Sequence, residues 1–184
     1  MKSQKVICSL LCCSALLSSV PAFAYTDTYD GYTTQVNSFN EGWKYSNGHW
    51  YYQLYQGNRV TGWLHNNNAW YYMDNQGYMK TGWLQYNNSW YFLDSTGKMR
   101  TGWVKSKGKW YYLADSGAML HNVWVQVDGK WYYLNSDGSM RTGWLHCGDA
   151  SYFLLSDGSM MTKPFKIGNV SYYPNKSGAV TIRG

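Results

Sequence analysis

A repeat of about 20 residues covers most of the chain and limits its fold more than any other feature. Gly-Trp recurs at this spacing, and in the fifth unit Val123-Trp124 comes one residue late. The first tryptophans of the first six units are Trp43, Trp63, Trp83, Trp103, Trp124 and Trp144. In five units a second tryptophan follows seven residues later and starts a run of three aromatic residues: Trp50, Trp70, Trp90, Trp110 and Trp131. A unit this short cannot bury both of its faces, so neighbouring units must stack.

Each unit has the sequence pattern of a β-hairpin. Trp and Tyr favour strands, and between the paired tryptophans lie residues that tolerate the positive φ of tight hairpin loops. In the fifth unit, a two-residue loop at Asp128-Gly129 would pair Trp124 with Tyr133 and leave Tyr132 on the opposite face. Other units, such as residues 65–68, leave the loop type open. The pattern predicts an all-β fold, a repeat solenoid of stacked β-hairpins.

A glycine closes each unit, and turn-forming residues precede it, as at 74–77 and 135–138. Two residues after this glycine, five units carry methionine: Met79, Met99, Met119, Met140 and Met160. Arg59 takes this place in the first unit. The array covers residues 41–184 in about seven repeats, of which the last one or two are degenerate.

Residues 1–24 have the pattern of a signal peptide. Lys2 and Lys5 precede a short apolar run, and Ala22-Phe23-Ala24 is a small-x-small cleavage site. We expect no membrane span, because the apolar run is too short to cross a bilayer comfortably. Residues 25–40 form a short N-terminal segment of unassigned role. Cleavage after Ala24 would leave Cys147 as the one cysteine, so no internal disulfide is expected.

The composition disfavours several classes of function. Aromatic residues make up 19% of the chain and charged residues 14%, and removal of Lys2 and Lys5 lowers the net charge from +6 to +4. This charge is far from the dense basic stripe of a nucleic-acid-binding protein. The four histidines lie at scattered repeat positions without a clustered metal-ligand set or a nucleophile in a fixed arrangement. We therefore expect neither an enzyme nor a metal site or cofactor.

Two tryptophans per unit on one face exceed what packing requires, although the middle tyrosines of the aromatic runs suit a core. Electron-rich rings that meet at an angle can hold a quaternary ammonium group by cation–π attraction, and methionine adds a polarizable wall. Flat sugars that stack on tryptophan are the rival ligand. Composition alone does not separate these two ligands.

The run from Gly77 to Trp83 (GYMKTGW), with Trp90-Tyr91-Phe92-Leu93-Asp94, resembles the choline-binding repeat of pneumococcal-type surface proteins and lytic enzymes. The resemblance implies a left-handed β-superhelix with choline sites between consecutive hairpins. Each aromatic cage would take two tryptophans from one repeat and a third ring from the next. It implies the cages Trp43, Trp50, Tyr72; Trp63, Trp70, Phe92; Trp83, Trp90, Tyr112; Trp103, Trp110, Tyr133; and Trp124, Trp131, Phe153, with Met79, Met99, Met119 and Met140 as further walls.

Three departures from the repeat bear on these cages. Arg59 replaces the methionine of the first unit and would repel choline if it pointed into the first cage. The extra residue before Trp124 would shift the neighbour of the fourth cage. The sixth unit has Ser151 in place of the second tryptophan and so lacks one wall.

The resemblance implies a non-catalytic surface protein, secreted and retained on the cell wall. It would bind the phosphocholine groups of teichoic and lipoteichoic acids. The alternative is a glycan-binding module like the glucan-binding or clostridial-toxin repeats. The seventh unit would expose Phe165, Tyr172 and Tyr173, an apolar end through which two copies could form a homodimer.

Overall fold

The structure, a computed structural model, describes residues 41–55 and 57–183. The predicted signal peptide and the segment 25–40 lie outside the described residues. Within the described part there are strands and turns but no helix, and therefore no helix that could span a membrane. The strands are β1 (Gly42–Ser46), β2 (His49–Gln53), β3 (Gly62–Asn66), β4 (Ala69–Met73), β5 (Gly82–Tyr86), β6 (Ser89–Leu93), β7 (Gly102–Ser106), β8 (Lys109–Leu113), β9 (Val123–Val127), β10 (Lys130–Leu134), β11 (Gly143–Cys147), β12 (Ala150–Leu154), β13 (Phe165–Ile167), β14 (Val170–Pro174) and β15 (Val180–Arg183).

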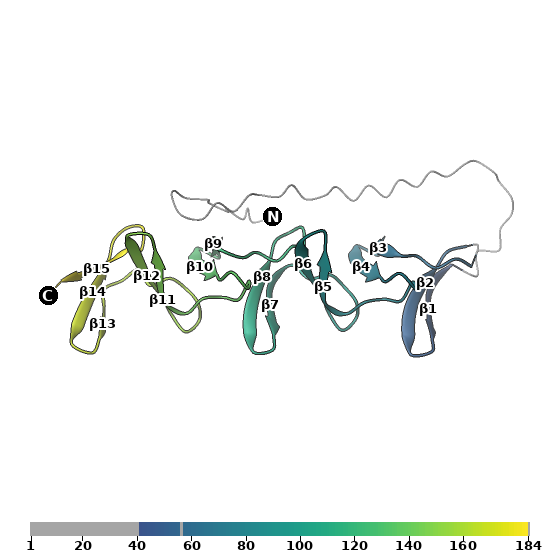
Figure 1. Cartoon of the computed structure of the whole chain (residues 1–184), viewed down its shortest axis with the longest axis horizontal. Coiled ribbons are helices and arrows are strands. Elements are labelled where there is room, and N and C mark those ends of the chain that lie inside the picture. The colour runs from purple at the N-terminus through teal and green to yellow at the C-terminus, as the bar shows by residue number, and fades with distance from the viewer. Residues whose placement is uncertain (1–40, 56, 184) are drawn as a thin grey trace. The chain divides into compact units, whose positions relative to one another are not determined.

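Consecutive strands pair into seven antiparallel hairpins, and β15 adds a third strand to the last one (Figure 1). The all-β repeat of hairpins predicted from the sequence is confirmed. The handedness of a superhelix stays a prediction. Hairpins β1–β2 to β5–β6 form an N-terminal unit with residues 115–118, and hairpins β7–β8 to β13–β14 form a C-terminal unit with β15.

Every hairpin turns through two residues. Asp128 and Gly129 have φ of 48° and 78°, and Trp124 pairs with Tyr133 as predicted. The loop that the sequence left open also has two residues, Asn67 and Asn68, with φ of 47° and 58°. Positive φ at both positions matches the right-handed twist of the flanking strands. The register therefore places both tryptophans of a pair on one face of the hairpin.

Within each unit, backbone hydrogen bonds join a hairpin to the segment that follows the next one. In the N-terminal unit, the Met79 N–H donates to the Trp50 carbonyl at 2.8 Å, and the Met99 N–H donates to that of Trp70 at 2.8 Å. In the C-terminal unit, the Met140 N–H donates to the Trp110 carbonyl at 2.7 Å. Because each link spans a whole repeat, a hairpin is held by its neighbours as well as by its own ladder.

The core combines aromatic and aliphatic side chains. The last residue of the second strand is at most 1% exposed in five hairpins: Met73, Leu93, Leu113, Leu134 and Leu154. The middle tyrosines Tyr71 and Tyr91 are 7% and 2% exposed, which confirms their predicted place in the core. The sequence analysis did not single out the buried aliphatic position, which occurs once per repeat.

The predicted turns between units are confirmed. The Gly77 N–H donates to the Asp74 carbonyl at 2.9 Å, and the Gly138 N–H makes the same bond to Asn135. The closing glycines have φ near 80°, and from Gly77 onward they pack against the preceding repeat: the thioether of Met79 lies where a Cβ on Gly97 would stand. These glycines are required both by the backbone conformation and by the close approach of the methionine.

The extra residue before Trp124 is absorbed in the linker. Asn122 adopts φ of 50°, and its N–H donates to the Asn135 carbonyl at 3.1 Å. Val123 then pairs with Leu134, so the hairpin ladder resumes its regular register.

We predict a graded cost for glycine-to-alanine substitutions in the N-terminal unit. Gly82→Ala has open space around its new Cβ, so it costs about 1 kcal/mol from positive φ alone. Gly97→Ala adds displacement of the flexible Met79 side chain. Gly77→Ala should cost most, about 2 kcal/mol beyond the strain, because its Cβ would lie 2.6 Å from the less movable Arg59 Cβ. Urea unfolding of the three variants tests this order, and equal costs would contradict it.

Asp137 should make the C-terminal unit sensitive to acid. The Ser139 hydroxyl and N–H, with the Lys109 ammonium at 3.1 Å, lower the pKa of Asp137 to about 2. A lowered pKa contributes stability that is present above the unfolded value, about 3.9, and lost as the pH falls towards 2. Asp137→Asn should therefore lower Tm much more at pH 7 than at pH 2. Asp128→Asn, at a turn position without these bonds, is the matched control.

Candidate functional site

Four tryptophan pairs share one geometry. Their ring centroids lie 6.3–6.5 Å apart, and their planes meet at 78–86°. These pairs are Trp43 and Trp50, Trp63 and Trp70, Trp83 and Trp90, and Trp103 and Trp110. The two rings come from opposite strands of one hairpin, so the two-residue turn and the ladder fix their relative position. Each pair presents two ring faces that meet at nearly a right angle.

The first tryptophan of each pair is held from within its own hairpin. The last ring of the aromatic run contacts it edge to face. The ring centroids of Tyr72 and Trp63 lie 5.3 Å apart, and those of Tyr112 and Trp103 lie 5.0 Å apart. These two residues are direct cross-strand partners. Tyr72 and Tyr112, which the sequence analysis assigned to the preceding cage, therefore support the tryptophan of their own hairpin. Phe92, Tyr133 and Phe153 do the same for Trp83, Trp124 and Trp144.

The ring that reaches back from the next hairpin is the middle one of the aromatic run. Within each unit, the ring centroids of these pairs lie 4.7–5.1 Å apart: Trp43 and Tyr71, Trp63 and Tyr91, Trp103 and Tyr132, and Trp124 and Tyr152. Alternation along the strand explains this, because the face opposite the tryptophans of one hairpin is the face that meets the preceding hairpin. From the sequence, alternation placed Tyr132 on the face opposite the tryptophans, but only a packing role was predicted for this ring.

We call each tryptophan pair with this back-reaching ring a cage. The first cage is Trp43, Trp50 and Tyr71, the second is Trp63, Trp70 and Tyr91, and the fourth is Trp103, Trp110 and Tyr132. The third pair, Trp83 and Trp90, belongs to the N-terminal unit, and its predicted third ring Tyr112 belongs to the C-terminal unit.

The methionines lie beside the second tryptophan of the cages. The backbone bonds that place Met79 next to Trp50 and Met99 next to Trp70 repeat with Met140 and Trp110. Met140 packs on the cluster of Tyr112, Val125 and Leu134 that also receives Trp103 and Tyr132. Met119 pairs with Leu113 and packs against Gly138.

The second tryptophan is exposed to solvent in three of the four perpendicular pairs. Trp50, Trp90 and Trp110 are 41–46% exposed, whereas the first tryptophans of their pairs are half-buried. Burial raises the pKa of Tyr91, so its phenol stays neutral at ordinary pH. The arrangement offers a small cation two or three ring faces and an exit for whatever chain carries it.

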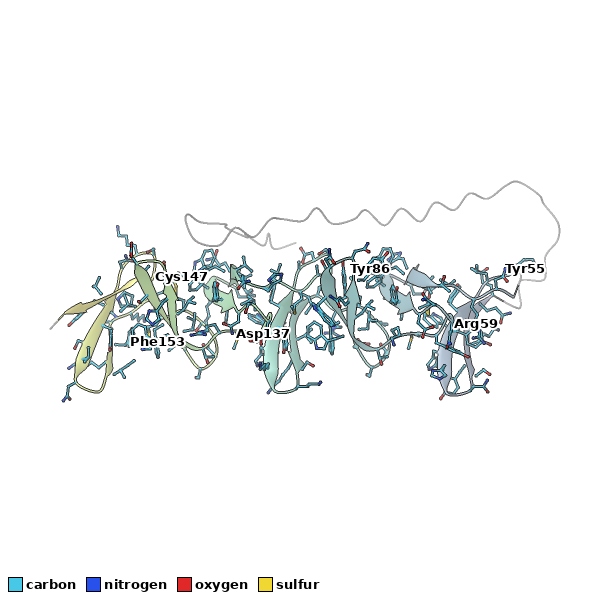
Figure 2. All side chains as sticks on the ribbon, in the orientation of Figure 1. Tyr55, Arg59, Tyr86, Asp137, Cys147 and Phe153 are labelled. Atoms are coloured by element: carbon cyan, nitrogen blue, oxygen red, sulfur yellow. The ribbon has the colours of Figure 1, made fainter. Side chains whose placement is uncertain are left out.

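Arg59 lies outside the first cage. Its guanidinium carbon stands 4.2 Å from the Tyr51 ring centroid and 4.8 Å from that of Tyr78, and it donates to the Gln76 carbonyl at 3.3 Å. Figure 2 labels it at the start of the described chain. The methionine beside the first cage is Met79, so the repulsion considered from the sequence does not arise there.

The fourth and fifth sites differ in their response to the extra residue. Trp103 meets Tyr132 at 5.0 Å, so the neighbour of the fourth cage is in place. In the described residues, Trp124 and Trp131 do not make the perpendicular contact of the other four pairs. The fifth hairpin begins with Val123 where those four hairpins have a glycine at positive φ.

The sixth tryptophan is packed by its own neighbours. The centroid of the Trp144 ring lies 5.1 Å from that of Phe153 and 5.0 Å from that of Tyr172. Phe165 stacks on both Phe153 and Tyr172. Phe165 and Tyr172 are therefore half-buried, which corrects the expectation that they form an exposed end. Ile167, Val170 and Tyr173 are the exposed apolar residues there, at 37–42%.

No group of three or more His, Cys, Asp or Glu side chains within 41–55 and 57–183 could hold a metal ion. His146 accepts or donates a hydrogen bond at 2.8 Å with Ser151, its cross-strand partner, and stacks on Trp144.

Comparison with known proteins gives a consistent family. The profile of the choline-binding repeat matches residues 60–96, 80–124 and 123–165, more than half of the chain. A second profile, of a cell wall binding repeat, matches residues 41–52. No curated protein sequence matches the chain in a direct comparison.

Solved structures of choline-binding proteins from Streptococcus pneumoniae are similar to the chain. CbpJ is 38% identical over 77% of this chain and 52% of its own, with a TM-score of 0.71. Choline binding protein F is 38% identical over 77% of this chain and 51% of its own, with a TM-score of 0.69. The choline-binding domain of CbpL is 32% identical over 77% and 86%, with a TM-score of 0.52. The chain thus spans about half the length of the first two relatives.

We predict that Phe165 stabilises the C-terminal hairpins. Phe165→Ala removes the ring stacked on Phe153 and Tyr172 and should lower the free energy of unfolding by about 2 kcal/mol, less than for a fully buried ring. Ile167→Ala, at a position 42% exposed, is the control and should change it by less than about 0.5 kcal/mol. Thermal unfolding measures both, and equal effects would rule out the packing role.

Proposed function

Because the chain belongs to the choline-binding repeat family, we propose that its cages bind choline and attach it to a choline-bearing cell wall. The ligand would be the phosphocholine of teichoic and lipoteichoic acids. Proteins of this family are cell-wall-associated surface proteins. Secretion through the signal peptide at residues 1–24 is part of the proposal.

The perpendicular tryptophan pair carries this proposal. A trimethylammonium group cannot donate a hydrogen bond, so a site for it needs electron-rich faces in place of acceptors. Two indoles at 78–86° provide two such faces, and the tyrosine of the next hairpin lies against the first indole. Each well-placed ring contributes about 1 kcal/mol. The third walls we propose are Tyr71, Tyr91, Tyr132 and Tyr152, in place of the rings assigned from the sequence.

Several weak cages on one chain give strong attachment to a polymer. A small cation makes few contacts, so each cage alone binds weakly. Once one cage holds the polymer, the others meet its remaining phosphocholines at high effective concentration. We therefore propose attachment without catalysis as the role of residues 41–184, with self-association through the C-terminal repeat as an additional, separate expectation.

Choline should also stabilise the fold. Each cage contains rings from two consecutive hairpins, so choline binds the stacked state and not the unfolded chain. Linkage then requires that the stability rise as RT ln(1 + [L]/Kd) for each occupied site.

The experiment that decides between choline and glycan binding is elution from an amine resin that mimics choline. Free choline at millimolar concentration should release the full chain, whereas dextran should not. High salt should leave it bound, because the cation–π attraction acts in a partly dry site that salt screens little. Release by dextran would favour the glycan-binding alternative, and release by salt alone would indicate an electrostatic coat.

Loss of the second tryptophans should abolish retention stepwise. Trp110→Ala should weaken retention on choline-bearing walls modestly, and the combined Trp50→Ala, Trp70→Ala, Trp90→Ala and Trp110→Ala variant should be released. Tyr55→Ala is the matched control, since Tyr55 is 41% exposed and belongs to no cage (Figure 2). Circular dichroism checks folding, and a folded quadruple variant that stays on the wall would show that the cages are misassigned.

A further inference from the structure

The hairpin β7–β8 differs in charge from the other described hairpins. It carries three lysines, Lys105, Lys107 and Lys109, and no carboxylate. The other described hairpins carry at most one lysine each. This hairpin also supplies both tryptophans of the fourth cage, so the positive charge lies beside one cage and not along the whole array.

Lys105 occupies a repeat position that touches the ligand-facing tryptophan. The residue paired across the ladder with the second tryptophan varies among the five tryptophan pairs: Tyr45, His65, Gln85, Lys105 and Gln126. In the first two cages its ring contacts that tryptophan, with centroids of Tyr45 and Trp50 5.2 Å apart and those of His65 and Trp70 4.8 Å apart. The residue at this position is therefore the side chain that lies beside the second tryptophan of each pair.

The Lys105 ammonium lies 5.7 Å from the centroid of the Trp110 ring, which is 41% exposed. Among the residues that the structure describes, no carboxylate pairs with it. Lys109, by contrast, is held by Asp137 at 3.1 Å. Lys105 thus keeps an uncompensated charge at the open side of the fourth cage.

We propose that Lys105 makes the fourth cage selective for phosphocholine over free choline, an inference that rests on the proposed function. The trimethylammonium group lies against the rings, and the phosphate attached to it leaves the cage towards solvent. There the Lys105 ammonium forms an ion pair with the phosphate. The third tryptophan pair, Trp83 and Trp90, has neutral Gln85 at the same position and lacks this preference.

The Lys105 charge has opposite effects on the two ligands, and both effects raise the ratio of the choline to the phosphocholine dissociation constant. A bare choline cation is repelled by the ammonium beside Trp110, which weakens its binding. Phosphocholine carries an anionic group at the cage opening, so the same ammonium attracts it. The ratio of the two dissociation constants is therefore the sensitive quantity, whereas either constant alone also contains the cation–π contribution. For an exposed pair we expect a change in this ratio of about threefold.

Site-resolved titration tests the proposal. The indole N–H signals of Trp110 and Trp90 in the 15N-labelled full chain report the fourth cage and the third tryptophan pair separately. Choline and phosphocholine are titrated at pH 7.5 and constant low ionic strength, with inorganic phosphate as a third probe. The variants are Lys105→Gln, which makes the fourth pair like the third, and Gln85→Lys, which places a positive charge beside the third tryptophan pair.

In the wild-type chain, the ratio of the choline to the phosphocholine dissociation constant should be about threefold higher at Trp110 than at Trp90. Lys105→Gln should remove this difference, Gln85→Lys should raise the ratio at Trp90, and added salt should reduce both effects. Equal changes for both ligands in Lys105→Gln would show that Lys105 competes for the cage and would overturn the proposal. Saturation of the Trp110 signal by inorganic phosphate alone would overturn it as well. If choline moves neither signal, the proposed function itself fails.

Discussion

The contact between the first tryptophan of one hairpin and the middle tyrosine of the next is the interaction on which the other features depend. A two-stranded hairpin of this length is marginal in water, and the ring contact at 4.7–5.1 Å, with the backbone bonds to the following linker, gives it neighbours on both faces. The same contact aligns the tryptophan pair against a third ring. Stability and binding therefore arise from the same side chains, so a change in one cage also affects the stacking of two hairpins.

The sequence alone predicts the hairpins, the turns and the tryptophan pairs, because each depends on short-range chemistry. Asp128 and Gly129 require positive φ, and strand alternation then fixes the faces of Trp124, Trp131 and Tyr133. The third ring is different, because it depends on which face of the next hairpin turns back towards the first. Tyr71 and Tyr72 are adjacent and equally aromatic, and the sequence contains no local signal that ranks them. Alternation combined with stacking would have favoured Tyr71.

Two further features depend on contacts one repeat apart. The buried residue at the end of each second strand, such as Leu93 or Leu134, lies in an unremarkable sequence context and is identified only by its 0% exposure. Arg59 appeared from the sequence to be a methionine substitute in the first cage. In the fold, this repeat position contacts the closing glycine of the next turn, here Gly77, and the guanidinium lies on Tyr51 and Tyr78.

The packing of Met79 on Gly97 recurs one repeat later with Met99 and Gly117, and in the C-terminal unit with Met140 and Gly158. Within the N-terminal or the C-terminal unit, consecutive hairpins therefore contact one another through the same pair of surfaces. If a gene duplication or deletion added or removed one 20-residue block, the hairpins on either side of the change would still have matching contact surfaces. Array length can thus vary between descendants of such a sequence without new packing solutions, and each added block brings one more pair of indoles. The same contact extends to both ends of the array, where Arg59 packs on Gly77 and Met160 packs on Gly178.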